Sequence, residues 1–127
     1  MLKPPPAPCR ACPYRTDAPA GAKAEDRYET LAAYDLPTPF QPEEVLMCDE
    51  RKGCLCGGWL MSHDRRQLLA LQLHADRVDP SVWDYAPDVE VFASGHDAAD
   101  HGLSGLDAED KQAPRRMAGT LYPSRLS

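Results

Sequence analysis

The chain has few aromatic side chains and no long apolar run. Aromatic residues make up 7% of its 127 residues, so few large side chains are present to fill a core. No stretch approaches the roughly 20 apolar residues that cross a bilayer, and the N-terminus is proline-rich where a secretory signal has an apolar segment. We therefore expect one small cytoplasmic domain without a membrane segment.

An excess of positive charge is also lacking. The formal net charge is −6 and the sequence pI is near 5.1, which opposes the attraction to phosphates on which nucleic-acid binding depends. We therefore do not expect the chain to bind nucleic acid by itself. We expect its partner to be another protein. No pattern specifies an oligomeric state.

Prolines and cysteines are abundant. Thirteen prolines break up regular structure, and a domain with a small core commonly needs disulfides or a metal to hold it. In a reducing compartment, five cysteines with close pairs indicate metal ligation more than a disulfide framework.

Hydrophobic periodicity predicts an α+β fold, a small single metal-stabilised domain with three short helices and a few short strands. The helices are expected at 24–34, at 64–75 with Asp64 as its cap, and after 94, with Gly102 as the stop. The strands are expected at 45–47 and 89–92. The expected core consists of Trp59, the Leu68–Leu73 helix and Trp83.

The chain divides into three parts by composition. We expect residues 1–8 to form a proline-rich extended arm, residues 9–106 a four-cysteine metal-binding domain, and residues 107–127 a flexible polar tail.

Four cysteines are spaced as metal ligands. The set reads Cys9-x2-Cys12-x35-Cys48-x7-Cys56, and the first spacing lets one turn direct two sulfurs at a single ion. The second spacing is longer than in zinc fingers, and Cys54 competes with Cys56 as the fourth ligand. We prefer Cys56 because two glycines and Trp59 follow it, and we treat Cys54 as a free thiol.

Zinc is the expected metal, with an iron–sulfur cluster as the alternative. Thiolates suit both, and Pro13 directly after Cys12 is similar to the Cys-Pro endings of ferredoxin motifs. The lack of a close triplet of cysteines favours zinc.

Enzymatic interpretations of the motif fit less well. A zinc deaminase needs His-x-Glu before its Pro-Cys-x-x-Cys, and all four histidines follow it here. A thioredoxin-like site needs a preceding strand, and only eight residues precede Cys9. A hydrolytic zinc site would need a histidine ligand from among His63, His96 and His101, none of which is paired with an arranged carboxylate. We assign no catalytic residues.

Two motifs carry a family resemblance. Pro8-Cys-Arg-Ala-Cys-Pro-Tyr-Arg15 and Cys56-Gly-Gly-Trp59 resemble those of an uncharacterised family of small cysteine-motif proteins from actinobacteria and their phages. The family pattern often has His directly after the third cysteine, where this chain has Asp49. The resemblance implies no activity.

We expect a non-catalytic protein-interaction or regulatory module with structural zinc. An iron–sulfur redox or sensor protein is the first alternative, and a zinc-dependent enzyme is the second.

Overall fold

Short helices joined by irregular segments make up the described part of the chain. The structure is a computed structural model that describes residues 1–106. Four α-helices occur there: α1 (Glu25–Ala33), α2 (Gly57–Ser62), α3 (Leu69–Leu73) and α4 (Gly95–Ser104). Four single 3-10 turns accompany them: η1 (Thr38–Phe40), η2 (Arg65–Gln67), η3 (Ala75–Arg77) and η4 (Pro80–Val82).

The expected α+β fold is wrong. Residues 1–106 contain no β-strand, only isolated bridges, including Met47 with Leu55 and Val91 with Arg15. A ladder needs several consecutive backbone groups with partners. The apolar run at 45–47 and the alternating stretch at 89–92 are too short to supply them, and Pro42 and Pro87 remove backbone donors shortly before each.

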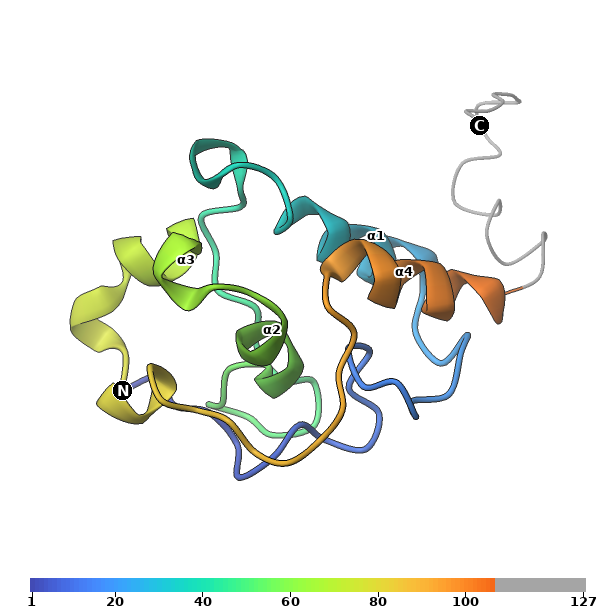
Figure 1. The fold of residues 1–127 in the computed structure, drawn as a ribbon, viewed down its shortest axis with the longest axis horizontal. Helices are drawn as coiled ribbons and strands as arrows, with labels where there is room; N and C mark the ends of the chain where they lie inside the picture. The colour runs from blue at the N-terminus through green and yellow to red at the C-terminus, as the bar shows by residue number, and fades with distance from the viewer. Residues whose placement is uncertain (107–127) are drawn as a thin grey trace.

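Helices α1 and α4 lie side by side, as Figure 1 shows. Helix α1 occupies the expected 24–34 stretch and buries Tyr28 and Leu31. The Ser94 hydroxyl caps α4 by accepting a hydrogen bond from the Asp97 N–H at 3.0 Å. Gly102 does not stop this helix: a Cβ there would lie 2.0 Å from the Tyr28 ring, so the glycine lets the two helices approach.

The single helix expected at 64–75 is replaced by η2, α3 and η3. Asp64 does act as a cap, of η2. The helix breaks at Leu68 because side chains from another segment bind the neighbouring backbone groups. The Gln41 side-chain oxygen accepts from the Leu69 N–H at 2.9 Å, and the Thr38 hydroxyl donates to the Gln67 carbonyl at 2.7 Å.

The core is centred on Trp59, which is completely buried, with tyrosines around it. Leu68 and Leu71 join this core as expected, whereas Leu73 is 52% exposed and Trp83 is partly buried. The tyrosines that sequence reasoning did not place in the core are Tyr14, Tyr28, Tyr34 and Tyr85.

The first eight residues pack against the rest of the chain. Leu2 bridges to Val78 and Lys3 to Cys54, and Pro5 is buried. The predicted tail at 107–127 lies outside the described residues. Within residues 1–106, none of the helices has the length and apolar character needed to cross a membrane.

Candidate metal centre

The first two cysteines lie in a tight turn. The Cys12 N–H donates to the Cys9 carbonyl at 2.9 Å, and the Arg15 N–H donates to the Cys12 carbonyl at 3.0 Å. Arg15 pairs with both carboxylate oxygens of Asp17, at 2.7 and 2.8 Å, and also donates to the Pro8 carbonyl at 3.1 Å. Arg15 therefore fixes the chain on both sides of the turn.

The other cysteines come from a short hairpin-like segment. The Cys48 N–H donates to the Cys54 carbonyl at 2.9 Å, and the Cys56 N–H donates to the Leu46 carbonyl at 2.8 Å. Gly53 closes the connecting turn with a φ of 83°, a conformation that favours glycine. These bonds flank the Met47–Leu55 bridge and hold the two cysteine-bearing segments together.

Helix α2 follows Cys56 directly and begins with two glycines. A Cβ on Gly58 would lie 2.4 Å from the Tyr14 Cβ and 2.7 Å from the Cys12 sulfur. The glycine thus lets the α2 backbone approach the N-terminal turn, and its N–H donates to the Cys12 sulfur. The backbone N–H groups of Tyr14 and Arg15 donate to the same sulfur.

The four predicted ligands Cys9, Cys12, Cys48 and Cys56 line one small cavity of about 10 Å³. The sulfurs of Cys12 and Cys56 lie 3.7 Å apart, and Cys48 affects the pKa of Cys9 more than Cys12 does. We therefore treat the four cysteines as two pairs, each between the N-terminal turn and the 46–56 segment. Across residues 1–106, no three His, Cys, Asp or Glu side chains stand in the arrangement of a formed metal site.

The pKa values of Cys12 and Cys56 are shifted in opposite directions. The hydrogen bond with Cys56 lowers the pKa of Cys12 to about 7, helped by the backbone donors. The same bond, with complete burial, raises the pKa of Cys56. Burial, together with the charge of Cys48 and its hydrogen bond, raises the pKa of Cys9 to about 12. The Cys12–Cys56 pair is thus arranged to hold one thiolate stabilised by N–H groups.

Two cations and one anion also line the cavity, and sequence reasoning missed them. Asp49 accepts from Lys23 and from Arg27, each at 3.0 Å. The Arg27 Nε is buried without a hydrogen-bond partner, and the Arg27 charge acts on Cys56. No motif marks these positions, because Lys23 and Arg27 come from a different segment than Asp49.

Cys54 and the histidines lie elsewhere. Cys54 is buried but does not line the cavity, and neither does any histidine. His63 Nδ1 contacts the Trp59 carbonyl at 2.8 Å, His101 Nε2 contacts the Ala18 carbonyl at 2.8 Å, and His96 faces Asp100.

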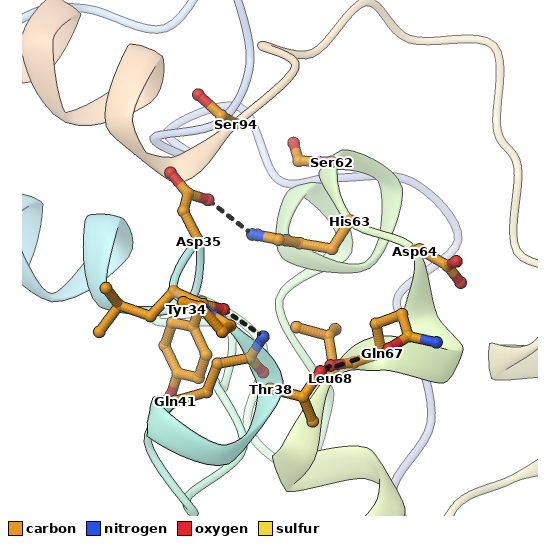
Figure 2. A pocket seen from close by; sticks show the side chains of 12 residues that line it. Tyr34, Asp35, Thr38, Gln41, Ser62, His63, Asp64, Gln67, Leu68 and Ser94 are labelled. Carbon is orange, nitrogen blue, oxygen red and sulfur yellow. Dashed lines mark hydrogen bonds and ion pairs between the residues drawn. The ribbon is translucent and has the colours of Figure 1, made fainter.

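A larger, open hollow of about 450 Å³ lies beside His63 (Figure 2). His63 Nε2 points at Asp35 across a distance of 3.0 Å, and its other ring nitrogen faces the Trp59 carbonyl. The two ring nitrogens of His63 therefore face a backbone carbonyl and a carboxylate. Asp35 also accepts from the Gly95 and His96 N–H groups at 2.9 and 2.7 Å. These groups form a structural network without a free base.

Fold and cavity together define a small chain whose described residues form short helices and irregular segments, with a cluster of cysteines from two distant segments. The model of one protein family, described as "Family of unknown function (DUF6283)", matches residues 4–122. The chain belongs to that family. No curated protein and no solved structure matches it.

Proposed function

We propose that this chain is a non-catalytic protein whose fold is stabilised by one zinc ion bound to Cys9, Cys12, Cys48 and Cys56. The observation that carries the proposal is the convergence of these four cysteines on one cavity. Cys12 and Cys48 are separated by 35 residues, so ligation would close a long loop and couple metal affinity to folding.

The distance within one pair supports a tetrahedral zinc ion. Sulfurs about 2.3 Å from a tetrahedral zinc lie about 3.8 Å from one another, and those of Cys12 and Cys56 are 3.7 Å apart. Zinc would replace the bonds within both pairs by thiolate–metal bonds and release the remaining thiol protons. The Cys9–Cys48 pair would complete the coordination.

The surroundings also suit a negatively charged centre. A zinc ion with four thiolates carries a net charge of about −2. The N–H groups that donate to Cys12 would stabilise that charge, as would Lys23 and the buried, unpartnered Nε of Arg27. Such outer hydrogen bonds commonly orient metal ligands.

An iron–sulfur redox or sensor protein is the alternative, because the same thiolates bind both centres. The lack of a close triplet of cysteines in the sequence supports zinc over a cluster. Four thiolates around zinc leave no position for water, which is why we place a zinc-dependent enzyme third.

Elemental analysis of the purified full chain tests the proposal. We expect about one zinc per chain, nearly complete loss of zinc in Cys56→Ser, and retention in the matched variant Cys54→Ser. Loss of zinc in Cys54→Ser alone would overturn the ligand assignment. Iron with acid-labile sulfide would establish the alternative.

The proposed role is that of a cytoplasmic protein-interaction or regulatory module of actinobacterial or phage origin. Phe40 is 72% exposed and Leu36 is 46% exposed on the proline-rich segment after α1, which suits an apolar contact with a protein partner. We expect Phe40→Asp to lose a partner that Leu73→Asp keeps in affinity capture. If both variants capture the same partners, the surface around Leu36 and Phe40 is not the site of the protein contact.

A further inference from the structure

The arrangement of the cysteines bears on oxidation as well as on metal binding. The two thiols of the Cys9-x2-Cys12 motif are the usual candidates for a disulfide in such a sequence. Here, however, the Cys12 sulfur lies 3.7 Å from that of Cys56, and Cys9 shares the cavity with Cys48. A disulfide within the motif would have to draw Cys9 and Cys12 away from these partners.

The two pairs differ in exposure. Cys12 and Cys56 are 2% and 4% exposed, so an oxidant in solution has little access to their sulfurs. Cys9 and Cys48 are both partly exposed. A peroxide must reach a sulfur before it can oxidise it, so accessibility selects the Cys9–Cys48 pair although Cys12 has the lower pKa.

We propose that hydrogen peroxide or a related small peroxide converts Cys9 and Cys48 into an intramolecular disulfide, and that this oxidation releases the bound metal. The pairing rests on the cavity that Cys9 and Cys48 share and on their partial exposure, whereas the release of metal rests on the zinc site proposed above. Cys9 and Cys48 would thus form a site of oxidative modification that thiol reduction reverses.

The chemistry balances with one peroxide. One thiolate of the pair attacks the peroxide, an S–O bond forms, the O–O bond breaks, and the hydroxide takes up a proton to leave as water. The partner thiolate then attacks that sulfur, an S–S bond forms, the S–O bond breaks, and a second water leaves. Two thiols lose two electrons in total, and the metal loses two of its four ligands.

Trypsin separates the relevant cysteines. Cleavage after Arg10, Arg15, Arg27, Arg51, Lys52 and Arg65 places Cys9 in residues 1–10, Cys12 in 11–15, Cys48 in 28–51, and Cys54 with Cys56 in 53–65. Mass spectrometry of unreduced digests therefore reads the connectivity directly. Cys54→Ser serves as the matched control, because it removes the one cysteine that is outside the cavity.

The full chain, stripped of metal under reducing conditions and then treated with one equivalent of hydrogen peroxide, should yield residues 1–10 linked to residues 28–51. Cys54→Ser should give the same product. A link between 1–10 and 11–15, a link between 11–15 and 53–65 as the main product, or sulfinic acid without a disulfide would each overturn the proposal.

The zinc-loaded chain tests whether formation of the disulfide releases the metal. We expect about one zinc released to a chromogenic chelator for each Cys9–Cys48 disulfide formed, and recovery of binding after reduction. If the disulfide forms while zinc stays bound, the release mechanism is wrong. If the chain never binds metal but forms this disulfide, the proposed function fails while the pairing stands.

Discussion

Single residues decide how closely the backbone approaches the cysteines. Gly58 lies where the α2 backbone meets both Tyr14 and the Cys12 sulfur. Arg65 connects α2 to the 82–85 segment. Its guanidinium donates to the carbonyls of Leu60, at 2.9 Å, of Val82, at 2.8 Å, and of Tyr85. Both positions therefore act on the backbone that surrounds the core.

Gly58→Ala should destabilise the protein although alanine is the better helix former. The propensity gain is about 1 kcal/mol, whereas a Cβ placed 2.4 Å from the Tyr14 Cβ forces a backbone shift costing about 1–3 kcal/mol. Zinc affinity should also fall, because the Gly58 N–H moves away from Cys12. Urea unfolding and zinc competition measure the two effects.

Gly53→Ala provides the control. Its φ of 83° makes alanine costly by about 1 kcal/mol, but no atom lies within 4 Å of the added Cβ. Equal losses of zinc affinity in both variants would contradict a specific role for Gly58.

Arg65→Lys should cost about 2 kcal/mol of unfolding free energy, because an ammonium group cannot reproduce the planar fork that reaches three carbonyls. Arg66→Lys changes the neighbouring exposed arginine and should remain within about 0.5 kcal/mol of the parent protein. Paired urea titrations measure both. Matching midpoints would show that the Arg65 contacts contribute nothing.

At the scale of elements, one carboxylate joins three helices. Asp35 follows α1, faces His63 at the end of α2, and accepts from the first N–H groups of α4. An acidic side chain at a helix N-terminus also interacts favourably with the helix dipole. Asp35 is thus expected to matter more for stability than the N-cap of α4 itself.

Asp35→Ala should lower the free energy of unfolding by about 2–3 kcal/mol, because two backbone N–H groups lose their acceptor and His63 loses its carboxylate partner. Ser94→Ala removes the N-cap hydroxyl alone and should cost about 1 kcal/mol. Chemical denaturation of both variants gives the comparison. If Asp35→Ala lowers the free energy of unfolding less than Ser94→Ala does, Asp35 does not stabilise the contact between α1, α2 and α4.

The sequence predicted elements where local signals were strong. The Ser94 cap and the acidic start of α1 located two helices closely, because capping and charge act within one turn. The strands were wrong because three or four alternating residues do not ensure a partner strand. Helix α2 was not among the predicted helices, because its two glycines are poor helix formers and their close approach to Tyr14 is visible only in the tertiary structure.

The candidate site was predictable to a similar extent. The Cys9–Cys12 spacing is a local signal, and the choice of Cys56 over Cys54 followed from the glycines after it. Lys23, Arg27 and Asp49 were not predicted, because charged residues far apart in the sequence carry no pattern before the chain brings them together.

At the scale of the whole molecule, we expect a bound metal to supplement a small core. Cysteines of residues 9–12 and 48–56 line the same cavity, and a metal would cross-link the two segments directly. The apolar core around Trp59 would then be held at a second point. Stability should therefore depend strongly on the ion.

Chelation of the metal under reducing conditions should lower the melting temperature by about 10–20 °C, corresponding to a few kcal/mol for a domain of this size. Calorimetry or circular dichroism follows the transition. Cys12→Ser should already melt at the lower temperature and show no further shift with chelator. Unchanged melting of the parent chain would mean that no metal stabilises the fold.

X-ray absorption at the zinc edge of the purified full chain tests the central claim most directly. We predict a single shell of four sulfurs at about 2.3 Å, without nitrogen or oxygen neighbours. A shell that includes oxygen or nitrogen, fewer than four sulfurs, or no bound zinc would contradict it.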